Sequence, residues 1–406
     1  MTKGLLSNYF KGVAAKYLSV VETRPNKSNQ HEFNGINSFR EILGESEHKF
    51  PGKLVYLGSD ESDILSSKSD LTWYDSRQNQ PKRSAEYRLY FQTNVVMEQA
   101  EPGDLLIIGL RSDDSLFVII AKANTTFESQ LLWLFALENI GSKFNIKRIE
   151  DKSDISLNFA IRYIFDELGI EVKEDAEELL DLLIKEFGNG FPTTRQFSAF
   201  ARKTFGETDI LRKPDDTLVN WIDHEEMLFR TFEKHLVGER LKTGFANDVD
   251  EFISFSLSVQ NRRKSRAGYA LENHLEFIFK EQKLRYSRGE VTEHRAKPDF
   301  IFPGISYYRD TKFSADFLTM LGVKSTCKDR WRQVLSEATR IENKHLFTLE
   351  PAISNNQTEE MKSNKLQLVI PSELHSTYLQ NQREWLIDLA SFLDIVKNRQ
   401  TASSVL

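Results

Sequence analysis

The sequence predicts two domains, a mainly β domain in the N-terminal third and an α/β domain in the rest of the chain. A chain of 406 residues is long for one domain. Residues 1–146 contain short β-prone runs separated by Gly, Asp, Asn and Pro clusters, as in a compact barrel or sandwich. Residues 157–406 predict helices followed by strands, a helix and further strands, an order typical of a three-layer α/β domain. We expect the linker at residues 147–156, which are charged and irregular.

The N-terminal domain is predicted to be built mainly from strands. The expected strands are Lys53–Gly58, Leu71–Ser76, Arg88–Phe91, Asp104–Leu110 and Ser115–Ala121. A helix is predicted over Leu5–Val20, and the apolar run Phe127–Leu137 predicts a second helix that closes the domain. The polar segment Ser28–Gly35 is conspicuous, but its chemistry indicates no role.

The α/β domain is predicted to begin with helices. The expected helices are Leu157–Leu168, Ala176–Phe187, Thr194–Thr204, Thr217–Leu241, Asp248–Val259 and Ala267–Lys283. The elements that follow are strands at Leu284–Ser287, Asp299–Phe302 and Phe317–Ser325, a helix at Asp329–Glu342, strands at His345–Leu349 and Leu366–Ile370, and a helix at Arg383–Val396. The last residues, Gln400–Leu406, are expected to fray.

Asp299 and Lys324 carry the candidate chemistry. Each adjoins a short apolar, β-prone run, so two neighbouring strands would place a carboxylate beside an ammonium group. Phosphodiester hydrolysis needs a carboxylate that holds a hard divalent cation such as Mg²⁺, and a cation that polarises a water or the phosphate. On the residue pattern alone, however, most such pairs are a strand-end turn and a surface lysine.

Two further carboxylates are candidates for the same site. An acid is normally expected two residues before the lysine, but Gly322 occupies that position. Glu337, on the predicted helix after Lys324, is the best-placed replacement and would hold the metal together with Asp299. Glu272 could support the site from its own helix, although a lone helical Glu more often pairs with a surface Arg or Lys.

Cations are concentrated around these residues although the net charge is −6. Lys328, Asp329 and Arg330 stand at the start of a predicted helix, where Lys or Arg can read guanine and a carboxylate can accept from cytosine. Alternatively, Asp329 caps the helix and the cations clamp phosphates. Upstream, Arg262 and Arg263 belong to a run with four cations in six residues.

A hairpin in the N-terminal domain also combines aromatic and charged side chains. Trp73 and Tyr74 are followed by a charged set that could grip a nucleic-acid backbone and read base edges. The members of this set are Arg77, Lys82, Arg83, Glu86 and Arg88. On charge pattern alone, a solvated hairpin with two core aromatics explains these residues more simply.

Residues 258–349 closely resemble the catalytic domain of the EcoRII family of type II (type IIE) restriction endonucleases. The segments that carry this resemblance are Asn261–Gly268 (NRRKSRAG), Lys297–Phe300 (KPDF), Lys324–Gln333 (KSTCKDRWRQ) and His345–Leu349 (HLFTL). Weaker agreement extends to Pro214–Asp216 and Phe229. The resemblance implies a PD-(D/E)XK fold and a Mg²⁺-dependent site-specific deoxyribonuclease. Carried over by position, Asp299, Lys324 and Glu337 form the catalytic set, and Asp299 and Glu337 hold the metal.

The same resemblance implies how duplex DNA is recognised. The family reads C·G pairs with the triplet that matches Lys328, Asp329 and Arg330, which implies a CCNGG- or CCWGG-like site. Trp221 stands where the family has an arginine that packs against an extruded base. An indole could stack on that base, but a core tryptophan is equally compatible with the sequence.

For the N-terminal domain, the resemblance is weaker and implies a B3-like pseudobarrel. That domain would bind a second DNA copy as an allosteric effector through the hairpin set, Arg77, Lys82, Arg83, Glu86 and Arg88. The resemblance also implies a homodimer and a companion DNA methyltransferase. The alternative function is a sequence-specific DNA-binding protein of the same fold whose cleavage is impaired or restricted to modified DNA.

Composition excludes several other classes of protein. The one cysteine, Cys327, allows neither a disulfide framework nor a cysteine-based zinc site, which fits a reducing compartment. No segment resembles a signal peptide, and no apolar run approaches the ~20 residues of a membrane span. We therefore expect a soluble protein of the prokaryotic cytoplasm without a membrane partner.

Overall fold

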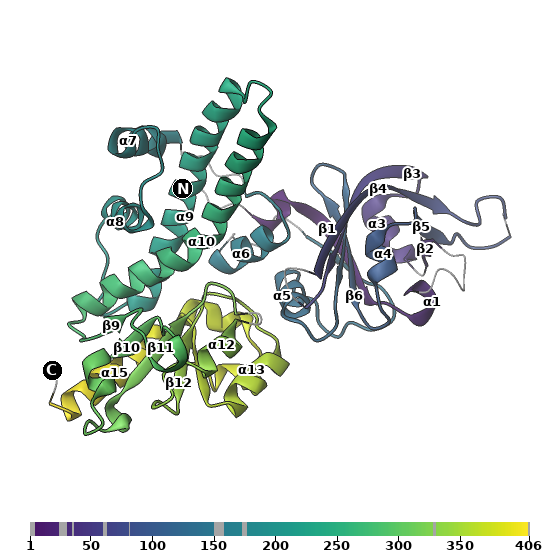
Figure 1. Ribbon diagram of the computed structural model, residues 1–406. Helices are drawn as coiled ribbons and strands as arrows, with labels where there is room; N and C mark the ends of the chain where they lie inside the picture. Colours follow the sequence, from purple (N-terminus) through teal and green to yellow (C-terminus); the bar gives the residue numbers. More distant parts are fainter. Residues whose placement is uncertain are drawn as a thin grey trace. The chain divides into compact units, whose positions relative to one another are not determined.

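The computed structural model describes residues 5–23, 31–34, 36–59, 63–80, 82–149, 158–172, 177–327 and 330–404 (Figure 1). The chain divides into two compact units. The first unit comprises residues 1–169 and 351–357, and the second comprises residues 170–350 and 358–406. Helix α6 (Phe159–Glu167), which we expected in the C-terminal domain, lies in the first unit. Most of the predicted linker, residues 150–156, lies outside the described residues.

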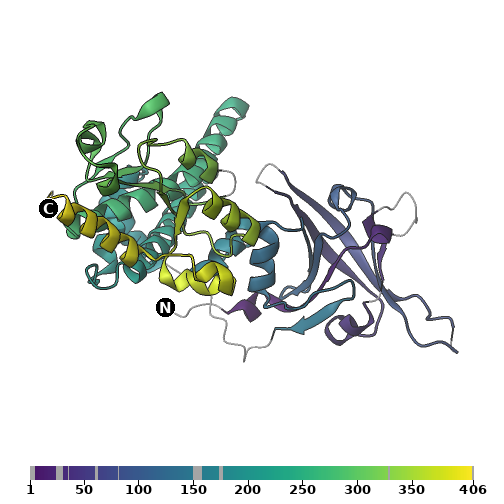
Figure 2. The same cartoon turned by 90° about the horizontal axis from the view of Figure 1, so that it is seen from below.

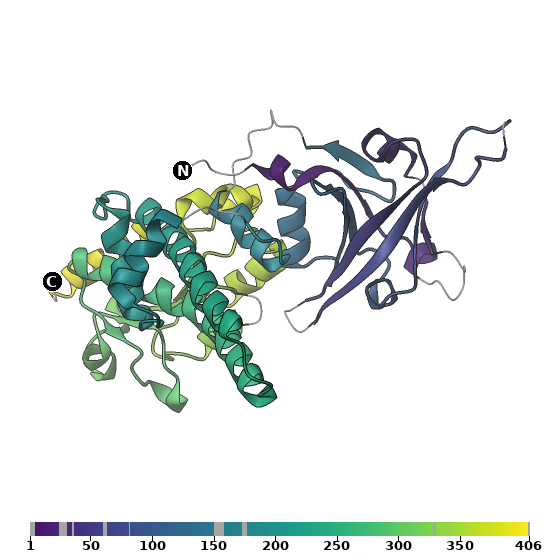
Figure 3. The ribbon, with the colours of Figure 1, turned by 90° about the horizontal axis from the view of Figure 1, so that it is seen from above.

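Among its described residues, the first unit contains one eight-stranded sheet in the order β2-β5-β4-β3-β7-β6-β1-β8. The strands are β1 (Phe10–Tyr17), β2 (Glu32–Phe33), β3 (His48–Leu57), β4 (Ile64–Asp75), β5 (Tyr87–Phe91), β6 (Leu105–Arg111), β7 (Leu116–Ala121) and β8 (Asn145–Arg148). Neighbouring strands are antiparallel except β3 and β7. Figure 3 shows the long strands β3 and β4 running side by side. The five predicted strands are confirmed, whereas β1, β2 and β8 were not predicted.

The helix predicted over Leu5–Val20 is wrong, because Phe10–Tyr17 forms the strand β1. This strand pairs with β6 on one side and β8 on the other, and nearly all of its side chains are buried. A strand buried on both faces has no alternating pattern, and a short apolar run does not distinguish it from a helix. Long-range pairing therefore decided the structure of this segment.

Short helices and aromatic side chains complete the first unit. The helices are α1 (Val20–Thr23), α3 (Arg40–Leu43), α4 (Val95–Gln99), α5 (Thr126–Leu134) and α6. Helix α5 confirms the predicted Phe127–Leu137 helix, and its N-cap Thr125 accepts a hydrogen bond from the backbone N–H of Glu128. In the core, Trp73 stacks on Tyr87 with ring centroids 4.9 Å apart. Both aromatic side chains therefore belong to the hydrophobic core of the first unit.

Four helices open the second unit. They are α7 (Glu177–Phe187), α8 (Thr194–Phe205), α9 (Pro214–Thr243) and α10 (Val249–Glu281). The first three confirm predicted helices, but α10 is one continuous helix where we predicted two. The intervening residues Asn261–Arg266 are rich in Arg and Lys, which are good helix formers, and nothing among them ends a helix. An aromatic cluster that includes Phe197, Phe229 and Phe232 packs α7, α8 and α9 together.

The second unit then forms a five-stranded mixed sheet in the order β13-β12-β11-β10-β9 among its described residues. The strands are β9 (Ser287–Arg288), β10 (Phe300–Phe302), β11 (Thr319–Val323), β12 (Lys344–Phe347) and β13 (Leu366–Val369). Strands β9, β10 and β11 are antiparallel, whereas β11, β12 and β13 are parallel. The remaining helices are α11 (Ile305–Arg309), α12 (Trp331–Leu335), α13 (Asn355–Ser363), α14 (Gln380–Arg383) and α15 (Leu389–Ala402). The predicted α/β fold is confirmed in this unit.

Two predicted helices have different limits in the structure. The helix expected over Asp329–Glu342 is only α12, which ends at Leu335, and Ala338 has a positive φ of 49° that does not continue a helix. The terminal helix begins at Leu389 rather than Arg383, because Asp388 caps it by accepting a 2.7 Å hydrogen bond from the N–H of Ser391. Figure 2 shows this helix, α15, beside the C-terminus.

A buried carboxylate connects the start of α9 with the start of α15. Asp215 Oδ1 accepts hydrogen bonds from the backbone N–H groups of Leu389 at 2.8 Å and Ser372 at 3.3 Å, and Oδ2 accepts from Ala390 at 3.0 Å. Asp215 is 5% exposed, and burial raises its pKa. This one side chain therefore satisfies donors at the N-terminus of α15 that would otherwise be buried without partners.

We predict that Asp215→Ala lowers the free energy of unfolding by about 1–3 kcal/mol, because it leaves buried N–H donors without acceptors. Urea unfolding of the full chain measures the effect. Asp216→Ala is the matched control, because Asp216 is the next residue of the same helix and is less buried. Equal stability of the two variants would contradict the structural role given to Asp215.

Candidate active site

The sheet of the second unit brings Asp299 and Lys324 together. Asp299 immediately precedes β10, and Lys324 immediately follows β11. These two strands are antiparallel neighbours, and Phe300 of β10 pairs with Leu321 of β11. Lys324 Nζ donates a 3.1 Å hydrogen bond to Asp299 Oδ2. The same oxygen accepts a 2.7 Å bond from the backbone N–H of Val323. Both side chains are partly exposed, so the pair remains accessible to a phosphate or a water.

Packing explains why Gly322 stands where an acid was expected. A Cβ atom at Gly322 would lie 2.9 Å and 3.0 Å from the two γ-methyl groups of Val334. Val334 is fully buried on α12, so it has little freedom to move aside. An acidic side chain at position 322 would therefore force α12 away from β11.

Glu337 is electrostatically coupled to both members of the pair. It lies two residues beyond the end of α12 and is half-buried. Burial raises its pKa to about 7, the ammonium of Lys324 opposes this shift, and the carboxylate of Asp299 adds to it. The atom Glu337 Oε2 is buried without a hydrogen-bond partner. The structure thus brings Asp299, Lys324 and Glu337 into one neighbourhood.

These carboxylates suit a hard divalent cation. A buried carboxylate oxygen without a donor and with a raised pKa would gain most from a nearby positive charge. Among the residues that the structure describes, no group of three or more His, Cys, Asp or Glu side chains could hold a metal ion. Mg²⁺ in proteins commonly uses one or two carboxylates and keeps several waters, so the donors Asp299 and Glu337 are sufficient for that ion.

The sequence left two roles open for Glu272, support of the active site and an ion pair with Arg or Lys, and the structure shows features of both. It forms a 2.8 Å ion pair with Arg288 of β9, as a lone helical Glu often does. Its pKa is also raised, first by burial and then by the carboxylate of Asp299. The carboxylates of Glu272 and Asp299 therefore interact electrostatically.

Sequence reasoning missed Arg288, which connects α10 to the sheet beside Asp299. Its guanidinium also donates to Asn273 Oδ1 at 3.0 Å and to Glu276 at 2.7 Å. In the pairing of β9 with β10, Arg288 lies opposite Phe300, the residue after Asp299. No local signal in the sequence could have identified it, because its role depends on the pairing of β9 with β10.

The residues predicted to recognise DNA are only partly described. Lys328 and Asp329 lie outside the described residues, and Arg330 is exposed. Arg263 forms a 2.7 Å ion pair with the buried Glu233, and the guanidinium of Arg262 lies 3.9 Å from the centre of the Phe191 ring. Both arginines thus already contact other residues of the second unit, and a role in DNA recognition stays a prediction.

Trp221 is a core residue in this structure. Its side chain is 2% exposed, and its ring centre lies 5.5 Å from that of His274 and 5.7 Å from that of Phe277. The indole could stack on a base only after the residues that cover it moved. The predicted base contact therefore stays a prediction.

The hairpin set of the first unit splits into paired and exposed residues. Arg77 forms an ion pair with Glu86, and Arg88 pairs with Glu86 at 3.1 Å and with Glu32 at 2.8 Å. Lys82 and Arg83 are exposed. The sequence did not reveal Glu32, because it reaches the hairpin from β2 through the pairing of β2 with β5.

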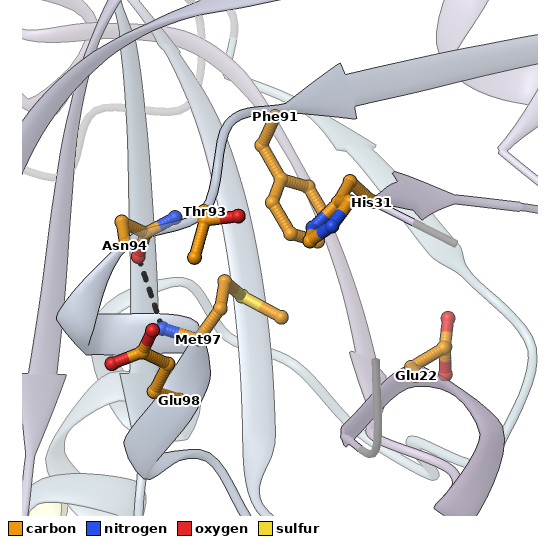
Figure 4. Close-up of a pocket in the computed structure, with 7 residues that line it drawn as sticks. All are labelled: Glu22, His31, Phe91, Thr93, Asn94, Met97 and Glu98. Atoms are coloured by element: carbon orange, nitrogen blue, oxygen red, sulfur yellow. Dashed lines mark hydrogen bonds between the residues drawn. The ribbon is translucent and has the colours of Figure 1, made fainter. Parts of the chain in front are cut away.

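A small pocket in the first unit lies next to this region (Figure 4). The rings of His31 and Phe91 lie together on one side of it, with centres 6.0 Å apart. Asn94 caps α4 by accepting a hydrogen bond from the N–H of Met97. The pocket includes part of the Ser28–Gly35 segment, of which residues 31–34 are described. Its chemistry assigns no role to that segment.

No helix within the described ranges is both long and apolar enough to span a bilayer.

Comparisons with known proteins identify relatives of the region that contains these residues. Residues 229–393 match the family model described as EcoRII C terminal, and this range contains Asp299, Lys324 and Glu337. The chain is 42% identical over 204 residues to the type II restriction enzyme EcoRII of Escherichia coli. This match covers 50% of the present chain and 50% of that enzyme, so the aligned region spans about half the length of the curated relative.

Solved structures of restriction endonucleases bound to DNA also resemble part of the chain. Metal-depleted Ecl18kI in complex with uncleaved, modified DNA is 18% identical, with a TM-score of 0.44 and coverage of 57% of this chain and 86% of that chain. The complex of restriction endonuclease PspGI with substrate DNA is 15% identical, with a TM-score of 0.44 and coverage of 52% and 94%. By sequence, residues 229–393 of this chain match the EcoRII C-terminal family model.

Proposed function

We propose that this protein is a Mg²⁺-dependent type II restriction endonuclease that cleaves double-stranded DNA at a CCNGG- or CCWGG-like site. The observation that carries the proposal is the 3.1 Å contact between Lys324 and Asp299, with the buried carboxylate of Glu337 coupled to both. These three residues lie within the range that matches the family model. The relative named as a type II restriction enzyme supports the same reaction class.

Asp299 and Glu337 are the residues that would hold Mg²⁺ in this proposal. When bound, the ion would supply Lewis acidity at the scissile phosphate and a more acidic water. Lys324 lies within hydrogen-bond distance of Asp299, so its ammonium can orient a water or contact a phosphate oxygen beside the metal ligands. Glu272, held by Arg288, would add negative charge near Asp299.

Recognition of the site is proposed to depend on residues beside this cluster. Lys328, Asp329 and Arg330 would read C·G pairs through the major groove. Arg262 and Arg263 would contact the DNA, and Trp221 would stack on an extruded base if its covering residues moved. The DNA-bound relatives support duplex DNA as the partner. Two copies of the chain would be needed to address both strands, so we propose a homodimer.

We further propose that the N-terminal part is an effector domain with a B3-like pseudobarrel fold. The domains in this proposal are residues 1–146 and 157–406, joined by a linker at 147–156. The β4–β5 hairpin supports the idea, because its exposed Lys82 and Arg83 stand beside the ion-paired Arg77, Glu86 and Arg88. A companion DNA methyltransferase in the same prokaryotic cytoplasm would protect host DNA.

We predict that Asp299→Ala and Lys324→Ala each reduce plasmid cleavage in Mg²⁺ by about 10²-fold or more, because each removes a group aimed at the reacting phosphate. Both variants should still bind a specific duplex in the absence of metal. Lys312→Ala is a matched control, since Lys312 is an exposed lysine of the same unit. Cleavage at the normal rate by either site variant would refute the assignment.

The same assay separates the proposal from the alternative function. Wild-type protein should cut an unmodified plasmid that carries CCWGG sites. Cleavage only of a cytosine-modified plasmid would instead support a modification-dependent enzyme, and binding without any cleavage would support an impaired one.

The pKa of Glu337 predicts how the need for metal changes with pH. Because this pKa is raised to about 7, the carboxyl group becomes protonated below that pH and a proton then competes with the metal. The Mg²⁺ concentration for half-maximal cleavage should therefore increase about tenfold for each pH unit below 7 and be constant above 8. Mg²⁺ titrations at pH 6, 7 and 8 measure this. Equal Mg²⁺ requirements at pH 6 and pH 8 would argue against Glu337 as a ligand.

We predict that the double substitution Lys82→Ala/Arg83→Ala impairs activation by a second DNA copy, because it removes two exposed phosphate-binding cations. The measurement is the concentration of an uncleavable specific duplex that half-maximally stimulates plasmid cleavage. We expect this concentration to increase and to depend less on salt. Lys49→Ala, which removes an exposed lysine from β3, should behave as wild type. Unchanged activation in the double variant would contradict the effector role of the hairpin.

A further inference from the structure

Among the described residues, no hydrogen bond to Oε2 fixes the carboxylate of Glu337. Glu337 Oε2 is buried and has no hydrogen-bond partner. Helix α12 ends at Leu335, and the following residues leave the helical path at Ala338, where φ is 49°. The backbone on the far side of Glu337 must therefore be anchored if this carboxylate is to stay beside Asp299.

That anchor begins with Arg340, three residues after Glu337. Its backbone N–H donates to the hydroxyl of Tyr308 at 3.3 Å. Its guanidinium donates to the carbonyl oxygens of Phe313 at 2.8 Å and Asp310 at 3.1 Å, and also to that of Tyr308. These contacts attach the segment after Glu337 to α11 and the residues that follow it.

Glu293 completes the anchor from the loop that leads to Asp299. Its carboxylate accepts from the Tyr308 hydroxyl, with distances of 2.8 Å to Oε1 and 2.7 Å to Oε2. Although burial opposes the shift, the Tyr308 hydroxyl and then Thr339, two residues after Glu337, lower the pKa of this carboxylate. One carboxylate therefore joins the segment after Glu337 to the segment before Asp299.

The loop that carries Glu293 is itself tightly folded. His294 and Arg295 have positive φ values of 56° and 63°, and the N–H of Thr292 donates to the carbonyl of Ala296 at 2.9 Å. At the ends of the loop, the N–H of Gly289 donates to the carbonyl of Asp299 at 3.1 Å. These hydrogen bonds close the loop on which Glu293 lies and join its start to Asp299.

A buried lysine interacts electrostatically with both Glu337 and Glu293. Lys344 is 8% exposed, and the charges of Glu337 and Glu293 both favour its ammonium form, although burial lowers its pKa overall. Its Nζ donates to the carbonyl of Ile341 at 2.7 Å, which fixes its position.

We propose that Glu293 is a positioning residue that fixes the carboxylate of Glu337 relative to Asp299 through Tyr308 and Arg340. This inference rests on the proposed function, because it concerns the spacing of the two proposed metal ligands. Glu293 contacts neither the DNA nor the reacting atoms in this role. Its removal should weaken metal binding while leaving recognition of the duplex intact, since residues that orient metal ligands typically contribute about 10- to 100-fold to metal affinity.

The test compares Glu293→Ala and Glu293→Gln with Glu290→Ala in the full chain. Glu290 is an exposed acid of the same loop and provides the matched control. Calorimetric titration with Mn²⁺ measures metal affinity directly, and plasmid cleavage over a range of Mg²⁺ concentrations measures the metal requirement. Thermal unfolding and duplex binding without metal show whether each variant is folded and still recognises DNA.

We expect Glu293→Ala to weaken Mn²⁺ binding and raise the Mg²⁺ requirement by about 10-fold or more. Glu293→Gln, which keeps one acceptor oxygen for Tyr308, should lose less, and Glu290→Ala should lose nothing. A folded Glu293→Ala variant with wild-type Mn²⁺ affinity would overturn the positioning role alone. Failure of the wild-type protein to bind Mn²⁺ or to cleave DNA would overturn the proposed function and this inference together.

Discussion

The antiparallel pairing of β10 with β11 is the constraint on which the site depends. Pairing of Phe300 with Leu321 places Asp299 at the start of one strand beside Lys324 at the end of the next. The N–H of Val323 then holds the Asp299 carboxylate at 2.7 Å, so backbone geometry orients the acid. Rigid strands provide the precision that a pair of catalytic groups requires.

The second carboxylate is placed by packing rather than by strand pairing. Val334 occupies the space that an acidic side chain at position 322 would need, so the acid must come from the far end of α12. Glu337 lies beyond that end, where a helix no longer fixes it, and Glu293 with Tyr308 and Arg340 supplies the missing support. The site therefore combines a precise strand pair with an acid whose position depends on a network of distant residues.

Much of this arrangement could be predicted from the sequence, and the exceptions have a common cause. The runs around Asp299 and Lys324 were recognisable as strands from local pattern, and the shared neighbourhood of Glu337 followed from the resemblance. Strand β1 was predicted as a helix because its burial depends on β6 and β8, which lie far along the chain. Arg288, Glu293 and Glu32 were missed for the same reason, since each acts through a partner that only the tertiary fold brings near.

The central claim is that Asp299 and Glu337 share one metal ion beside Lys324. The most direct measurement is anomalous diffraction from crystals of the protein grown with a specific duplex and Mn²⁺. The account predicts an anomalous peak bound by oxygen atoms of both carboxylates, next to a backbone phosphate. A peak elsewhere in the protein, or a metal held without Glu337, would contradict it.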